Sequence, residues 1–99
     1  KKTISITNVV ELTSFNPIKR FKVKDKGLIK EGYDADFTFV DLSMTKKISN
    51  KLIKSKCGWT PFHGMKVTGW PVGTMINGNK VFWNEKIIGK PIGKPVKFN

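Results

Sequence analysis

The spacing of hydrophobic positions changes early in the chain from a helical pattern to a β-type pattern. Residues 5–14 carry isoleucine, valine and leucine at helical spacing, and Ser5 or Thr7 can supply the N-cap. Asn16-Pro17 then indicates a break, because asparagine caps helices and proline is tolerated in the first helical turn. The pattern therefore predicts two short helices in succession, docked on a larger body.

From residue 25 onward the pattern predicts mainly antiparallel strands. The run 37–42 places apolar side chains on both faces of a strand, which is typical of a strand covered on both sides. Residues 45–49 are expected to form a short partner strand. Residues 50–64 contain two glycines and a proline, so an irregular connection is predicted there.

Two hairpin turns are predicted in the later part of the sequence. Asn77-Gly78 lies between two β-prone arms and favours a type I′ turn, in which both central residues have positive φ. Asn84-Glu85 permits a second reversal. Residues 90–99 contain two prolines, so we expect an extended tail on a surface and not a strand in mid-sheet.

Composition and charge narrow the classes of function. The formal net charge of +12 suggests an anionic partner, but every basic residue except Arg20 is a lysine, and the lysines are scattered. A solvated lysine-rich surface is therefore favoured over a specific nucleic-acid site. No apolar run approaches the roughly 20 residues of a membrane-spanning helix. The single cysteine cannot form an internal disulfide, which favours a reducing, cytoplasmic location.

Cys57 and His63 are the only cysteine and the only histidine, and they lie six residues apart. A thiolate–imidazole pair usually needs a third group to orient the base, and two ligands fall short of the three or four in a zinc site. We therefore favour a small buried thiol and a surface or hydrogen-bonded histidine without chemistry. Trp59 and Phe62 are expected to anchor the same connection.

The aspartates Asp34, Asp36 and Asp41 form the only acidic cluster and allow two interpretations. Paired carboxylates can bind a cation or perform acid–base chemistry. Aspartates next to glycine and alanine more often accept hydrogen bonds from the backbone N–H groups of turns. The turn interpretation is favoured.

The aromatic residues also allow two interpretations. Tryptophans in a basic chain can form a platform on which nucleic-acid bases stack, or they can fill the core of a small sheet. The core interpretation is favoured for Trp59, Trp70, Trp83, Phe62 and Phe82. Composition and spacing thus indicate an α+β chain, mostly antiparallel strands, without a complete active site.

The order of short motifs along the chain carries a family resemblance. An Asn-Pro in a helix is followed by Lys-Gly, by Gly-x-Asp-Ala-Asp and a strand, and later by Pro-Phe-x-Gly and Thr-x-x-x-Gly. This order resembles the C-terminal portion of amidohydrolases of the dihydroorotase, allantoinase and dihydropyrimidinase group, and "SKCGWTPF" with a later "GKP" resembles dihydroorotase most. The sequence departs from the family pattern at Lys22 and His63. The matching positions are Asn16, Pro17, Lys26, Gly27, Gly32, Asp34, Ala35, Asp36, Pro61, Phe62, Gly64, Thr74 and Gly78.

The resemblance implies a composite fold. The parent enzyme would be a (β/α)8 barrel plus a β-sandwich, in which residues 1–24 form the last helical segment of the barrel and residues 25–99 the C-terminal part of the sandwich with an extended tail. The zinc ligands and catalytic residues of the family would lie upstream of Lys1. We therefore expect no catalytic, substrate-binding or metal-binding residue in this chain.

The function implied by the resemblance is structural. The chain is expected to be the C-terminal segment of a zinc-dependent cyclic amidohydrolase that interconverts N-carbamoyl-L-aspartate and dihydroorotate in pyrimidine biosynthesis, and to be inactive alone. Its partner would be the remainder of the same polypeptide, with a homodimer left open and with no nucleic acid or membrane. The alternatives are a segment of an allantoinase or dihydropyrimidinase, or a free-standing basic β-domain that binds nucleic acid.

Overall fold

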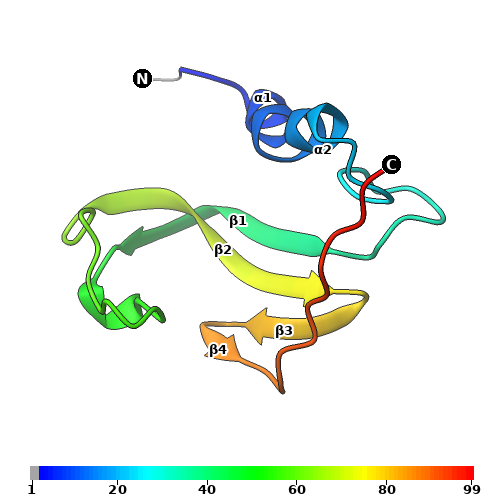
Figure 1. The fold of residues 1–99 in the computed structure, drawn as a ribbon. Coiled ribbons are helices and arrows are strands. Elements are labelled where there is room, and N and C mark those ends of the chain that lie inside the picture. Colours follow the sequence, from blue (N-terminus) through cyan, green and yellow to red (C-terminus); the bar gives the residue numbers. More distant parts are fainter. Residues whose placement is uncertain (1–2) are drawn as a thin grey trace.

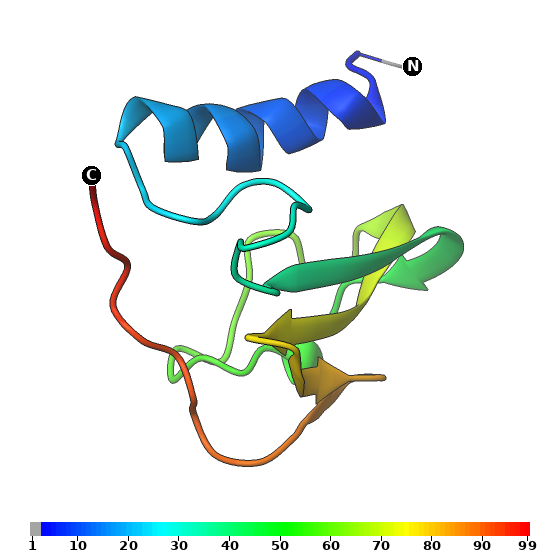
Figure 2. The same cartoon turned by 90° about the vertical axis from the view of Figure 1, so that its right-hand side faces the viewer.

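A computed structural model describes residues 3–99 as a helical segment above a small antiparallel sheet, with a long connection between them (Figure 1). The sheet has the order β1-β2-β3-β4, so each strand pairs with its neighbour in sequence. Figure 2 shows the helical segment lying across the β1 side of the sheet. The elements are α1 (Ile6–Val10), η1 (a π-helix, Glu11–Phe15), α2 (Asn16–Arg20), β1 (Phe37–Lys47), η2 (a 3₁₀ turn, Asn50–Leu52), β2 (Lys66–Ile76), β3 (Asn79–Trp83) and β4 (Lys86–Ile87).

The helical segment is continuous, so the predicted break at Asn16-Pro17 is wrong. Both residues lie within the helical segment, and the Asn16 N–H donates to the carbonyl of Glu11, five residues back. Proline has no N–H, and in an α-helix its ring collides with the carbonyl four residues earlier. The wider π turn relieves that collision, and the segment continues without a second N-cap.

Ser5 is the N-cap of this segment, which settles the choice between Ser5 and Thr7. The Ser5 side chain accepts a hydrogen bond from the Asn8 N–H at 3.1 Å. This bond satisfies one of the four N–H groups that the first turn of a helix leaves without a partner.

β1 is longer than the sequence indicates, and the prediction of a separate partner strand at 45–49 is wrong. Residues up to Lys47 belong to β1 itself, which pairs antiparallel with β2 across an irregularity between Asp41 and Thr45. The carboxylate of Asp41 accepts hydrogen bonds from the N–H groups of Ser43 and Met44. Because a side chain satisfies these amides, the strand can bulge locally and then resume its pairing.

The two predicted turns and the extended tail are confirmed. Asn77 and Gly78 have φ of 48° and 76°, and Asn84 and Glu85 have φ of 46° and 67°. The tail runs from β4 up to the end of α2 (Figures 1 and 2), where the Lys24 N–H donates to the carbonyl of Lys97 at 2.8 Å. Apart from η2, the connection 50–64 is irregular, as predicted.

The apolar surface of the chain is largely uncovered. A compact protein of this mass exposes about 5,700 Å², whereas this chain exposes 8431 Å². Among residues 3–99 no hydrophobic side chain is fully buried, and Val40 and Leu42 of β1 are 49% and 60% exposed. The cover that the pattern of β1 predicts on both faces is therefore not supplied by the described part of the chain.

Gly73 of β2 packs against an aromatic pair. The rings of Phe39 and Trp83 meet edge to face, with centroids 5.3 Å apart. A Cβ at Gly73 would lie 2.3 Å from ring atoms of Trp83. Glycine is therefore required at this position for the indole to lie against β2.

Replacing Gly73 by alanine tests this packing. We expect Gly73→Ala to lower the free energy of unfolding by about 1–3 kcal/mol, because the methyl group displaces the Trp83 ring. Gly93→Ala is the matched control, since an added Cβ there meets nothing within 4 Å. Denaturant titration of both variants checks the prediction, and equal effects would contradict it.

Candidate functional site

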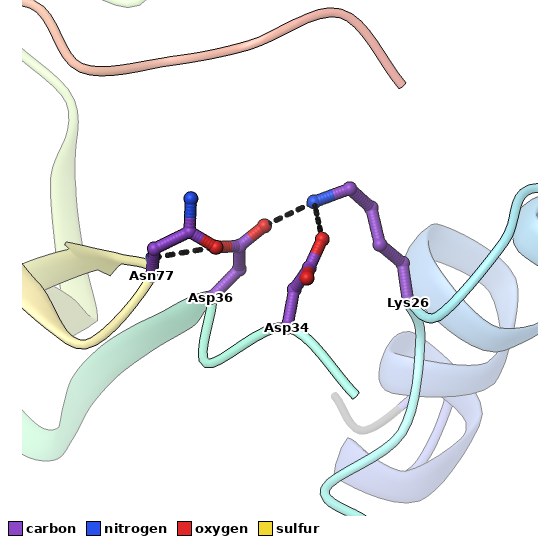
Figure 3. A network of polar contacts seen from close by, with 4 residues as sticks. All are labelled: Lys26, Asp34, Asp36 and Asn77. Carbon is purple, nitrogen blue, oxygen red and sulfur yellow. Dashed lines mark hydrogen bonds and ion pairs between the residues drawn. The ribbon is translucent and has the colours of Figure 1, made fainter. Parts of the chain in front are cut away.

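A cluster of polar contacts joins the helix–strand connection to the hairpin between β2 and β3 (Figure 3). The Lys26 ammonium forms ion pairs with Asp34, at 2.9 Å, and with Asp36. The second carboxylate oxygen of Asp36 accepts a hydrogen bond from the Asn77 N–H at 2.9 Å. The cluster therefore links residues up to 51 positions apart in sequence.

Local structure places Lys26 in this cluster. Gly27 follows it with φ of +88° and packs so closely on the helical segment that a Cβ would lie 2.9 Å from atoms of Ile18. The Asp34 N–H donates to the carbonyl of Asp25 at 2.9 Å, which closes the connection into a loop. The Lys-Gly and Asp-Ala-Asp motifs are thus two sides of one loop.

The electrostatics of the cluster favour a structural role. Hydrogen bonds to Asp36 and Asp34 raise the pKa of Lys26, and the hydrogen bond from Lys26, with that from the Asn77 N–H, lowers the pKa of Asp36. A carboxylate with a lowered pKa is a weak base, because its charged form is already stabilised. The arrangement holds charges in place and does not prepare a proton transfer.

The turn interpretation of the acidic cluster is confirmed in part. Asp41 bonds the amides of Ser43 and Met44, and the Ser43 hydroxyl bond is the main cause of the lowered pKa of Asp41. Asp36 also accepts from a turn N–H, but that turn is the distant β2–β3 hairpin. Asp34 forms an ion pair with Lys26, and among the hydrogen bonds of the described residues its carboxylate accepts none from a turn N–H.

Cys57 and His63 have different partners in the structure. His63 Nδ1 accepts a hydrogen bond from the Asn50 N–H at 2.9 Å, which confirms a hydrogen-bonded histidine. Cys57 Sγ lies 2.9 Å from Ser55 Oγ, and this contact lowers the pKa of the thiol. Cys57 is exposed, so the prediction of a buried thiol is wrong.

The aromatic residues divide between the sheet and the connection. Trp83 packs on Phe39. The centroid of the Trp70 ring lies 5.5 Å from the Lys46 ammonium, which sits over the face of the ring. Trp59 and Phe62 are 59% and 55% exposed, so the expectation that they anchor the connection is wrong for the described chain.

The described residues do not fit a metal ion. No group of three or more histidine, cysteine, aspartate or glutamate side chains lies close enough together in residues 3–99 to hold one. Zinc sites in proteins take three or four such ligands. In the same part of the chain, no helix is long and apolar enough to cross a membrane.

The fold and its motifs define the family. Residues 1–81 match the Amidohydrolase family, and the chain belongs to this family. A dihydroorotase from Pyrococcus furiosus is 41% identical over 96 residues, which are 97% of this chain and 23% of that protein. The predicted resemblance to dihydroorotases is thereby confirmed.

Related amidohydrolases of other substrate classes are also similar. An allantoinase from Desulfitobacterium hafniense is 33% identical over 93% of this chain and 20% of its own length. The structure of L-hydantoinase (dihydropyrimidinase) from Arthrobacter aurescens matches with a TM-score of 0.82 and 33% identity over 88% of this chain and 20% of that one. The chain therefore spans about a fifth of the length of its relatives.

Charge removal at Asp36 tests the cluster. Asp36→Asn keeps an oxygen for the Asn77 N–H but removes the ion pair with Lys26, so we expect a loss of about 0.5–1 kcal/mol in the free energy of unfolding at pH 7. The pKa of Asp36 is lowered by folding, so the native carboxylate stabilises above about pH 4 and the difference between the two proteins vanishes as pH falls further.

Lys26 sets the alkaline limit of the same effect. The pKa of Lys26 is raised by folding. The contribution of Lys26 to the free energy of unfolding is therefore complete below about pH 10 and is lost as pH rises through the raised value. Denaturant titrations across this pH range check both limits, with Glu31→Gln as the control for loss of an exposed carboxylate. An Asp36→Asn loss that is equally large at pH 3 and pH 7 would exclude the ion pair as its cause.

Proposed function

We propose that this chain is the C-terminal structural segment of a dihydroorotase-like, zinc-dependent cyclic amidohydrolase. The observation that carries the proposal is the similarity of nearly the whole chain to dihydroorotases, at 41% identity for the Pyrococcus furiosus protein. The whole enzyme would hydrolyse the ring amide of dihydroorotate and catalyse the reverse condensation of N-carbamoyl-L-aspartate. In this proposal residues 1–24 end the barrel and residues 25–99 contribute to a composite β-sandwich.

The large exposed surface of the chain supports a structural role within a larger body. The chain exposes about 2,700 Å² more than a compact protein of its mass. Permanent interfaces bury about 2,000–5,000 Å² in total, counting both sides. A contact that covers the excess on this one side would fall in the permanent class, as expected for parts of one polypeptide.

The metal chemistry of the proposed enzyme falls to residues outside this chain. Bound zinc would supply an activated hydroxide for attack on the ring amide, but residues 3–99 offer no group of three ligands. The described residues instead hold the helical segment and the sheet in a fixed relative position. The Lys26 cluster and the tail fix the end of the helical segment relative to the sheet, and the helical segment would in turn close the barrel.

A second candidate substrate class follows from the other relatives. The allantoinase covers 93% of the chain and the L-hydantoinase (dihydropyrimidinase) 88%, both at 33% identity. An allantoinase or dihydropyrimidinase is therefore the alternative to dihydroorotase.

The proposal predicts a division of activity between segments. The full-length polypeptide is expected to hydrolyse dihydroorotate, to lose that activity on treatment with a zinc chelator, and to regain it when zinc is restored. The 99-residue chain alone is expected to be inactive. A spectrophotometric assay with dihydroorotate, allantoin and dihydrouracil in parallel identifies the substrate class, and turnover by the 99-residue chain would contradict the proposal.

Cys57 and His63 are expected to take no part in that reaction. Cys57→Ser and His63→Gln should leave kcat/KM of the full-length enzyme within about twofold, because a lost catalytic group lowers it by 10²–10⁴. Glutamine at 63 keeps an acceptor for the Asn50 N–H. A hundredfold fall in kcat/KM of either variant, at unchanged thermal stability, would contradict this prediction and indicate a catalytic role for the residue.

A further inference from the structure

The last part of the chain brings together three lysines that are scattered in sequence. A groove of about 450 Å³ lies between β3 and the extended tail, and Lys80, Lys90 and Lys94 line it. Lys80 belongs to β3, whereas the other two belong to the tail, which leaves β4 and passes the β2–β3 turn (Figure 1). The Ile88 N–H donates to the carbonyl of Val81 at 2.8 Å and so holds the start of the tail against β3. The volume is within the usual range of small-molecule sites.

The tail side of the groove carries a short repeated motif. Gly-Lys-Pro followed by a branched apolar residue occurs at 89–92 and again at 93–96. A proline fixes its own φ and favours an extended conformation of the residue before it, which is a lysine in both copies. In an extended, polyproline-like chain four residues span about 12 Å. The repeat therefore presents Lys90 and Lys94 at a defined spacing, and little conformational entropy remains to be lost on binding.

The three ammonium groups have no counter-charge in the described chain. No acidic residue of 3–99 lines the groove, and the ion pairs of that part of the chain use Lys26 and Lys46. The Lys80 ammonium lies 4.4 Å from the ring centroid of Trp83. This cation–π contact positions the ammonium group and leaves its charge in place. Because like charges gathered in a cleft raise the local positive potential, the groove attracts anions.

The rest of the lining adds an uncharged donor and apolar surface. The backbone N–H of Asn77 donates to Asp36, but the Asn77 side-chain amide makes no hydrogen bond within residues 3–99 and can donate to an oxygen of a ligand. Val81, Ile88 and Ile92 supply apolar lining. Low-dielectric walls strengthen the attraction between the lysines and a bound anion.

We propose that this groove binds a small polyphosphate anion, that is, a linear chain of phosphoryl groups, either free or as part of a nucleotide. Lysine binds phosphate as a point charge, and arginine, whose planar fork suits carboxylates, is absent from the lining. Three separate point charges match an anion with several charges along its length better than a single carboxylate. Within residues 3–99 no aromatic side chain lines the groove, so it lacks the stacking platform of a single-strand nucleic-acid site. The inference goes beyond the proposed function and does not depend on the reaction catalysed.

Calorimetric titration of the full-length polypeptide with inorganic triphosphate and with ATP tests the site. We expect a Kd below about 1 mM, rising with ionic strength because exposed charges are screened by salt. Similar affinities for the two ligands would assign recognition to the phosphate chain alone, and binding of ATP at least about tenfold more tightly would assign it to a nucleotide. Absence of binding of both ligands at about 1 mM would overturn the inference.

Removal of the two tail charges locates the binding. Lys90→Gln with Lys94→Gln is expected to raise the Kd for triphosphate at least about tenfold, because each exposed charged contact contributes up to about fivefold. Lys54→Gln with Lys56→Gln is the matched control, since it makes the same change in net charge on the exposed connection outside the groove. Equal effects of the two double variants would show a response to net charge only and overturn the site. An unchanged Kd in the Lys90/Lys94 variant would place the anion elsewhere in the polypeptide and overturn it as well.

A single-stranded DNA oligonucleotide serves as the third ligand in the same titration. We expect it to bind the wild-type polypeptide and both double variants with Kd values within about threefold of one another, because only scattered lysines would hold it. An oligonucleotide that binds more tightly than triphosphate and loses that affinity only in the Lys90/Lys94 variant would assign the groove to nucleic acid and overturn the polyphosphate assignment.

Discussion

A four-stranded sheet and one helical segment offer too few faces to bury the apolar side chains that this chain carries. The helical segment turns Ile6, Val10 and Leu12 to solvent, and β1 does the same with Val40 and Leu42. Hydrophobic burial is the main favourable term in folding, so the described chain keeps its shape chiefly through backbone pairing and a few specific contacts. A radius of gyration of 15.3 Å, against about 12.6 Å for a compact domain of 99 residues, reflects the same shortage.

The specific contacts lie along one path from the helical segment to the sheet. Ile18 packs on Gly27, Lys26 next to it pairs with Asp36, and Asp36 holds the Asn77 N–H in the β2–β3 turn. The tail adds a second attachment by bonding residues 22–24. Because the loop and the hairpin meet through a charged side chain and a backbone amide, their relative position is fixed without a buried core. This is what a segment needs if it is to present a preformed surface to a larger body.

Much of this architecture could be predicted where geometry is local. Asn77-Gly78 and the Ser5 cap depend on residues within a few positions, so the sequence identifies the turn and narrows the cap to Ser5 or Thr7. The π-helix at Glu11–Phe15 was missed because the sequence shows the proline but not how the preceding turn adapts to it. The bond between Asp36 and Asn77 could not be predicted from local sequence, since the two residues lie 41 positions apart. Exposure of Cys57 and Trp59 depends on where the connection 50–64 projects, which no local pattern records.

The excess of lysines and the exposed apolar side chains are separate features, and both suit association with a larger body. Lysines outnumber the acidic residues by so much that only a few can find a carboxylate within the chain, and the ion pairs described in residues 3–99 use Lys26 and Lys46. Ion pairs at the rim of an interface steer and orient association, while apolar contact at its centre supplies the affinity. A chain with uncovered apolar strands and uncompensated lysines is therefore complementary to a body with apolar surface and acidic margins. A nucleic acid would meet the charge but not the apolar strands, so we propose a protein surface as the partner of this face.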